Sequence, residues 1–245
     1  MLHLSPLQRE VLEKLGVQIW QGREVEPEHA GQAVQSPAES AVAGEIEPVT
    51  VRSPAAPTLG AGLEEIGAAI TACTQCGLCK TRTHAVPGTG NQEAHWMFVG
   101  EAPGQHEDEQ GLPFVGRAGT LLDAMIQALG MHRDETFIAN VIKCRPPGNR
   151  DPLPEEVAAC EPYLHQQLGQ VRPRVIVALG RISAQALLKT TEPLGKMRGR
   201  VYQYGEHATP LVVTYHPAYL LRSPDQKHKT WQDLLLARSL VREAV

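Results

Sequence analysis

Four short apolar runs alternate with amphipathic segments from residue 95 onward, and this alternation most constrains the fold. The runs are Trp96–Val99, Phe137–Ile142, Val175–Leu179 and Leu211–Tyr215. Nearly continuous apolar runs of this kind are typical of strands buried on both faces of a parallel sheet. The segments between and after them have helical spacing of apolar residues, at 121–129, 154–168, 182–188 and 229–242. We therefore expect an α/β fold with helices on both faces of the sheet.

Polar side chains follow three of these strands. Glu101 comes directly after the first strand, Asn140 lies near the end of the second, and His216 follows the fourth. Ligands of parallel α/β sheets bind beyond the carboxyl ends of the strands, so we expect these three groups to converge on one edge. The chain has neither a G-x-G-x-x-G fingerprint nor a P-loop, which argues against a dinucleotide enzyme or a P-loop NTPase.

The cysteines have the spacing of a metal site. Cys73, Cys76 and Cys79 lie within seven residues, and Cys144 and Cys160 follow at a distance. A C-x2-C pair brings two thiolates to one metal centre, and a second pair can complete a four-ligand site. The odd number of cysteines argues against a disulfide scaffold. No further cysteine followed by proline comes soon after Cys79, which argues against a ferredoxin module, but spacing does not separate zinc from [4Fe–4S].

The net charge of −4 argues against a nucleic-acid partner only while the chain is taken as a whole. Residues 1–72 hold 4 Lys and Arg against 10 Asp and Glu, a net −6, whereas residues 73–245 hold 19 against 17, a net +2. Because a local site responds to local charge, DNA or RNA stays open as a partner of the C-terminal part.

The N-terminal part divides into two segments. Residues 1–20 are predicted to form an amphipathic helix with Leu7, Val11 and Leu15 on one stripe, either folded back on the domain or docked on a partner, for which we hypothesise a replication or repair protein. Residues 21–60 are rich in Ala, Glu, Pro, Ser and Gly and are predicted to be a disordered linker. Residues 61–245 form the remaining domain. Without an apolar stretch of membrane-spanning length or a visible secretory signal, we expect a cytoplasmic monomer.

Several motifs follow one another in a characteristic order: Cys73–Cys76, Gly100–Gly104, Gly111–Gly119, Asn140–Arg150, Val177–Gly180 and Tyr215–Arg222. In these motifs the chain, from Cys73 to about Leu240, resembles the family 4 uracil-DNA glycosylases, the iron–sulfur branch of the uracil-DNA glycosylase superfamily. The resemblance implies a three-layer α/β/α sandwich on a central four-stranded parallel sheet. It also implies a DNA repair enzyme that flips uracil out of single- or double-stranded DNA and hydrolyses its N-glycosidic bond, leaving an abasic site for base excision repair.

The resemblance also implies a cofactor. In the family a [4Fe–4S] cluster is held by cysteines that correspond here to Cys73, Cys76, Cys144 and Cys160, with zinc as the less favoured occupant. Cys79 falls outside this set and is expected to be a buried thiol beside it.

Roles in the reaction follow residue by residue. By resemblance, Glu101 orients the attacking water or stabilises the cationic sugar. Ala102 stands where family 1 enzymes have aspartate, so it can only line the pocket for the base. His216 is expected to donate a hydrogen bond to the uracil carbonyl on which negative charge accumulates. Asn140 offers an acceptor and a donor to uracil N3–H and O4, and Phe114 is expected to stack on the base, although a core phenylalanine is the alternative for Phe114.

DNA contacts are expected from four further residues. Leu220 matches the position that wedges into the stack vacated by the flipped base. Arg145, Arg150 and Arg222 are candidates for phosphate contacts, which position the duplex. None of the residues expected to act on the base is a lysine, so we expect a monofunctional glycosylase without lyase activity.

Two alternatives stay open. One is a uracil-DNA-binding or covalently trapping relative without turnover. Such relatives carry a basic, histidine-bearing insert after the strand of Asn140, and here Lys143–Asp151, which has no histidine, stands in its place. The other is an iron–sulfur electron carrier or zinc-held DNA-binding module. It explains the cysteines but leaves the convergence of Glu101, Asn140 and His216 unexplained.

Overall fold

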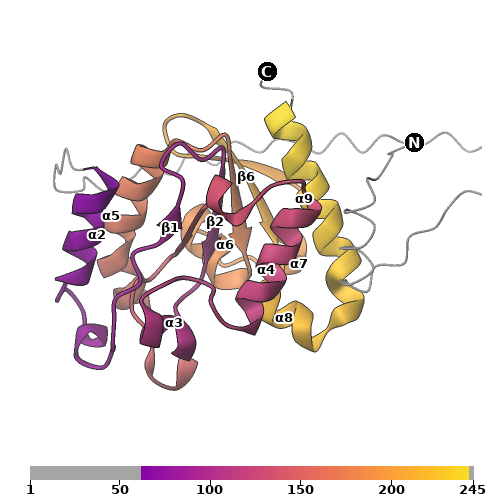
Figure 1. Cartoon of the computed structure of the whole chain (residues 1–245). Helices are drawn as coiled ribbons and strands as arrows, with labels where there is room; N and C mark the ends of the chain where they lie inside the picture. The colour runs from indigo at the N-terminus through magenta and orange to yellow at the C-terminus, as the bar shows by residue number, and fades with distance from the viewer. Residues whose placement is uncertain (1–61, 243–245) are drawn as a thin grey trace, which may run out of the picture.

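A computed structural model describes residues 62–242, in which helices cover both faces of one sheet (Figure 1). The predicted N-terminal helix at 1–20 and linker at 21–60 lie outside the described residues. In the part that is described, no helix is both long and apolar enough to cross a membrane.

The sheet has the order β1-β3-β2-β4-β6-β5. Its strands are β1 (Thr89–Gly90), β2 (Trp96–Gly100), β3 (Phe137–Asn140), β4 (Val175–Leu179), β5 (Val201–Tyr204) and β6 (Thr209–Thr214). The four central strands β3, β2, β4 and β6 are parallel, and β1 and β5 pair antiparallel at the two edges. The central four-stranded parallel sheet is therefore confirmed, with two edge strands added.

Helices form a layer on each face of the sheet. One layer contains α5 (Pro154–Val171), α6 (Arg181–Leu188) and α7 (Leu194–Met197), with α2 (Leu63–Thr71) packed on the outside of α5. The other contains α4 (Arg117–Ala128), α8 (Pro217–Arg222) and α9 (Lys227–Arg242). Alternate residues of one strand serve the two layers: Met97 and Val99 pack toward α5 and α6, and Trp96 and Phe98 pack toward α4. This double burial explains why the central strands are mostly apolar.

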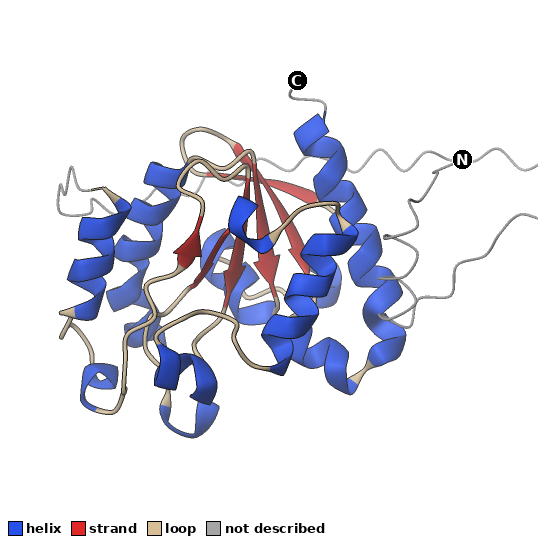
Figure 2. Ribbon diagram, viewed as in Figure 1, coloured by secondary structure: helices blue, strands red, loops and turns tan. Residues whose placement is uncertain are grey.

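The carboxyl ends of the parallel strands all meet at one edge, where α3 (Gln105–Gln110) and α8 lie (Figure 2). Single 3₁₀ turns η1 (Gly77–Lys80), η3 (Pro147–Asn149) and η4 (Pro224–Gln226) also lie in the loops, and η2 (Arg133–Glu135) precedes β3.

The main differences from the predicted elements concern strand ends and short helices. The second predicted strand, Phe137–Ile142, ends at Asn140, where the chain bends. The N–H groups of Val141 and Ile142 still donate to the Gly100 and Glu101 carbonyls, at 2.9 and 3.1 Å. The sequence interpretation missed the edge strand β5 and the six-residue helices α3 and α8, which are too short to establish a helical period.

Candidate active site

An open cavity of about 420 Å³ lies at the carboxyl edge of the sheet. The residues expected to act on the base all line it: Glu101, Ala102, Phe114, Asn140 and His216. Glu101 and Ala102 follow β2, and Phe114 lies between α3 and α4. Asn140 ends β3 and His216 follows β6, so the fold brings together residues that are far apart in the sequence. The volume is within the range of small-molecule sites.

Asn140 ends β3 with an unused acceptor. Its side chain is 2 % exposed, and its Oδ1 is buried without a hydrogen-bond partner among the described residues. An unpaired buried acceptor costs about 1–3 kcal/mol, so this atom is prepared for a donor that arrives with a ligand. Gly100 on the neighbouring strand keeps the space open, since a Cβ there would lie 2.7 Å from Cζ of Phe114 and closer still to Oδ1 of Asn140.

Phe114 is held in an unusual backbone conformation. Its φ of 53° lies in the left-handed region, which a bulky residue rarely adopts. Arg133 stabilises this loop: its Nη1 donates to the Phe114 carbonyl at 3.2 Å and to Asp123 at 2.6 Å, and its Nη2 donates to the Pro113 carbonyl at 2.5 Å. The Phe114 ring stacks on the His216 imidazole with 5.5 Å between centroids and 30° between planes. The two rings therefore form one wall of the cavity.

His216 is the N-cap of α8 and is fixed in one tautomer. Its Nδ1 accepts a hydrogen bond of 3.1 Å from the backbone N–H of Ala218. Because a backbone N–H can only donate, Nδ1 carries no proton, and in the neutral ring the proton is on Nε2. Burial, together with the charge of Arg222, lowers the pKa of His216 to about 4, and the charge of Glu107 opposes this shift. At neutral pH this imidazole is therefore an uncharged donor.

Glu101 presents a half-buried carboxylate to the cavity. Burial raises its pKa, as does the charge of Asp151, while Arg181 lowers it. Asp151 and Arg181 form an ion pair of 2.6 Å nearby. Within residues 62–242 no hydrogen bond or ion pair engages the Glu101 carboxylate, which leaves it available to a water molecule or a substrate.

The sequence interpretation assigned no role to Glu107 and Tyr219, which also line the cavity. Glu107 joins two loops, because its Oε2 accepts from Gly104 N–H at 3.1 Å while its Oε1 accepts from the N–H groups of Val115 and Gly116 at 3.0 and 3.1 Å. The spacing of Gly104 and Glu107 is that of a helix N-terminus and could have predicted the first bond. Tyr219 lies at the rim and is 36 % exposed.

The residues expected to contact DNA fall into two groups. Arg150 and Arg222 line the cavity, whereas Arg145 does not and donates to Asn149 at 2.8 Å. Arg150 is also paired with Glu156 through two hydrogen bonds of 2.7 and 2.9 Å.

Leu220 requires a correction. Its side chain is 1 % exposed and packs in the core with α4 and α9, since α8 turns this residue inward. It is therefore not placed to wedge into DNA, and the exposed residue beside it is Tyr219.

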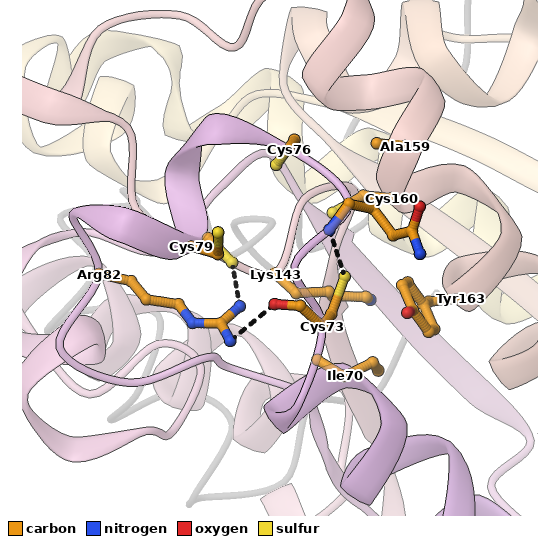
Figure 3. A pocket seen from close by; sticks show the side chains of 11 residues that line it. Ile70, Cys73, Cys76, Cys79, Arg82, Lys143, Ala159, Cys160 and Tyr163 are labelled. Atoms are coloured by element: carbon orange, nitrogen blue, oxygen red, sulfur yellow. Dashed lines mark hydrogen bonds between the residues drawn. The ribbon is translucent and has the colours of Figure 1, made fainter.

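All five cysteines line one narrow cavity of about 10 Å³ beside α2 and α5 (Figure 3). Cys79, expected outside the ligand set, lines it together with Cys73, Cys76, Cys144 and Cys160. In the described part of the chain, no group of three or more His, Cys, Asp or Glu side chains is arranged so that it could hold a metal ion. The sulfurs thus share one pocket without a closed coordination geometry.

Two basic side chains line the same pocket. The Nη1 of Arg82 donates to Sγ of Cys144 at 2.9 Å, and its Nη2 donates to the carbonyls of Thr71 and Cys73 at 2.7 and 3.0 Å. Lys143 is fully buried, and burial lowers its pKa to about 7. Burial also raises the pKa of the Cys160 thiol to about 11. The metal-free thiol is therefore protonated at neutral pH, and a metal ion would have to displace the proton.

Comparison with known proteins agrees with this architecture. Residues 87–235, more than half of the chain, match the family model described as the Uracil DNA glycosylase superfamily. The chain is 48 % identical over 181 residues to the type-4 uracil-DNA glycosylase of Pyrobaculum aerophilum, covering 71 % of this chain and 92 % of that one. It is 44 % identical to the protein of the same name from Archaeoglobus fulgidus, covering 70 % and 89 % of the two chains. The corresponding protein of Thermotoga maritima is 39 % identical, with 74 % and 95 % covered. The chain therefore belongs to the uracil DNA glycosylase superfamily and, within it, to the type-4 family.

Proposed function

We propose that this protein removes uracil from DNA by hydrolysing the bond between the base and deoxyribose, which leaves an abasic site for repair. The observation that carries the proposal is the unpaired Oδ1 of Asn140 in a cavity that also holds the Nε2–H donor of His216. Uracil carries an N3–H donor flanked by two carbonyl acceptors, which fits this pair of groups. The target nucleotide has to leave the base stack to reach the cavity.

Two charges develop as the bond breaks, and one residue is available for each. The departing uracil gains negative charge, which the neutral His216 stabilises by donating from Nε2 to a carbonyl oxygen of the base. The sugar gains positive charge at C1′, and Glu101 faces it with a carboxylate that also orients the attacking water. The water oxygen bonds to C1′ and its proton is released, while the uracil anion takes up a proton. Ala102 has no carboxylate, so this work falls on Glu101.

Phe114 supplies the stacking surface for the flipped base. Its ring already stacks on His216 at one wall of the cavity, and Arg133 fixes its backbone. A base held against this ring presents its edge to Asn140.

DNA is proposed to lie across the rim of the cavity. Arg222 and Arg150 are at the rim, and Arg145 lies in the same loop as Arg150, so all three are candidates for phosphate contacts. Arg150 has to share its guanidinium with Glu156, which makes Arg222 the stronger candidate.

The cysteine pocket is proposed to hold a [4Fe–4S] cluster through Cys73, Cys76, Cys144 and Cys160. The donor set fits, because thiolates are the usual cluster ligands and two basic side chains line the pocket beside them. When bound, such a cluster supplies an anionic, redox-capable centre that ties the segment after α2 to α5. Cys79 lines the same pocket, so it is the substitute ligand to test.

The activity is tested with an oligonucleotide that contains one uracil. Incubation with the purified protein followed by alkali should cleave the strand at the uracil position and should leave a matched cytosine strand intact. A stable protein–DNA adduct would support the trapping alternative, and absence of any cleavage would refute the glycosylase proposal. Broad visible absorption that is lost in Cys144→Ala would support the cluster, whereas a colourless, zinc-loaded protein would contradict it.

A further inference from the structure

Lys143 is a buried basic residue that the chemistry above does not use. Its side chain is 1 % exposed, and its Nζ donates hydrogen bonds of 2.7 Å to the backbone carbonyl of Asn140 and to Oε1 of Gln167. Gln167 is fixed in turn, since its Nε2 donates to the Pro87 carbonyl at 2.6 Å. Lys143 therefore joins the end of β3 to α5 and to the segment before β1.

The hydrogen-bond partners of this ammonium group among the described residues are both neutral. Within residues 62–242 none of the ion pairs involves Lys143. A buried charge without a counter-charge is strongly unfavourable. The pocket that Lys143 lines holds five thiols, and metal-bound thiolates are anionic. A metal centre bound by these thiolates would place negative charge beside Lys143, where the described residues provide none.

Arg82 offers a comparison on the other side of the same pocket. It also brings a positive charge to the thiols, through its hydrogen bond to Sγ of Cys144. Its remaining bonds go to the carbonyls of Thr71 and Cys73, on the cysteine side alone. Of these two basic residues, Lys143 is the one that also contacts β3, by donating to the backbone carbonyl of Asn140.

We infer that Lys143 is a positioning residue that couples the cysteine pocket to recognition of the base. On one side its ammonium balances the thiolate-held group, and on the other it fixes the carbonyl of Asn140 and thereby the direction of the Asn140 amide. The inference rests on the proposed function. It deepens that function by assigning to the cysteine pocket a part in selecting uracil.

Three variants distinguish the effect of the Lys143 charge on the cysteine pocket from the effect of its contact with Asn140. Lys143→Met removes the charge and the bond to Asn140. Gln167→Met leaves the charge but removes the side-chain anchor of the ammonium. Arg82→Met removes a charge from the pocket and leaves the contact with Asn140 intact.

Two readouts are measured on each purified holoprotein. The first is the reduction potential of the cluster, which we expect to become more negative in Lys143→Met and Arg82→Met and to stay unchanged in Gln167→Met, because removing a positive charge disfavours reduction. The second is binding to an oligonucleotide with one 2′-fluoro-2′-deoxyuridine, which resists hydrolysis, compared with the matched cytosine strand. Lys143→Met and Gln167→Met should lose about tenfold or more of the preference for uracil, and Arg82→Met should keep it.

The outcomes are distinguishable from failure of the proposed function. A wild-type protein that excises no uracil refutes that function. An active wild-type protein whose Lys143→Met and Gln167→Met variants keep the full preference overturns the inference alone, as does an unchanged potential in Lys143→Met. If Lys143→Met does not fold, the preference of Gln167→Met decides. If the wild-type protein is zinc-loaded, the binding comparison decides without the potential.

Discussion

The Nδ1 atom of His216 accepts a hydrogen bond of 3.1 Å from the backbone N–H of Ala218, within the first turn of α8. The same bond caps the helix and fixes the ring tautomer, so the Nε2–H donor is set by local backbone geometry. The Phe114 ring, stacked at 5.5 Å, restricts the imidazole from the other side. A donor fixed in this way loses little entropy when it meets the developing charge on uracil, which is the condition for effective electrostatic stabilisation.

Replacing His216 by alanine should lower kcat by about 10²–10³-fold, as expected for loss of one preorganised donor. His216→Gln, which can place an amide N–H near the position of Nε2, should recover part of this loss. Single-turnover excision from a uracil oligonucleotide measures both. The absorption of the cysteine pocket should be unchanged in the two variants, and equal turnover in His216→Ala and wild type would remove His216 from the mechanism.

The pH profile of excision should lack a step near pH 6.5, the usual imidazole pKa. Because burial lowers the pKa of His216 to about 4, this group stays neutral from pH 8 down to pH 5, and its proton count does not change in that range. Burial raises the pKa of Glu101 above its usual value, so of these two groups Glu101 should gain a proton first as the solution becomes acidic. We expect kcat to be level near neutrality and to fall on the acid side. A loss of activity centred at pH 6.5 that disappears in His216→Gln would contradict this assignment.

Asn140→Leu should separate activity from stability. The substitution removes a buried acceptor that has no partner among the described residues, so the free energy of unfolding should stay unchanged or rise by about 1 kcal/mol. Excision should fall by about 100-fold or more, since the base loses its complementary amide. Urea unfolding and single-turnover kinetics test the two effects. A large loss of stability would show that the Asn140 side chain has a structural role instead.

The sheet and the site could be predicted from the sequence to different extents. The four parallel strands were predictable because burial on both faces makes every position apolar, as in Val175–Leu179. The convergence of Glu101, Asn140 and His216 followed from their places after strands, since parallel topology puts strand ends at one edge. The short edge strand β1 has only two residues and gives no pattern to detect.

Residues whose surroundings depend on tertiary packing could not be predicted. Leu220 lies in a six-residue helix, which is too short for the pattern of apolar residues in the sequence to show which side faces the core. No pattern in the sequence marks Lys143 as buried, yet it is enclosed by α5, β3 and the cysteine pocket. The role of Glu107 in tying the loop at Val115 to α3 also depends on how that loop folds back.

Glu107→Ala should weaken excision through the loop that carries Phe114. The carboxylate accepts hydrogen bonds from three backbone N–H groups, at Gly104, Val115 and Gly116, and without it these donors lose their partner. We expect KM to rise and kcat to fall, with kcat/KM lower by about tenfold, because Phe114 is no longer fixed against His216. Glu109→Ala is the matched control, since Glu109 is an exposed residue of the same helix that pairs with Gln105 and His106.

Arg222→Ala should reduce the salt dependence of DNA binding. Arg222 is exposed at the rim of the cavity and lies in the last turn of α8. If it neutralises one phosphate, the slope of log K against log salt concentration should become less negative by about 0.9 for duplex DNA or about 0.7 for a single strand. Removing this charge also removes one of the two charges that shift the pKa of His216, so the pKa of that imidazole should rise.

The control is Arg172→Ala, because Arg172 is exposed between α5 and β4 at the opposite edge of the sheet. Fluorescence anisotropy with a labelled oligonucleotide between 50 and 300 mM salt, about the range over which such contacts weaken, measures the slope. Equal slopes for Arg222→Ala and Arg172→Ala would show that the DNA backbone does not pass over this part of the rim.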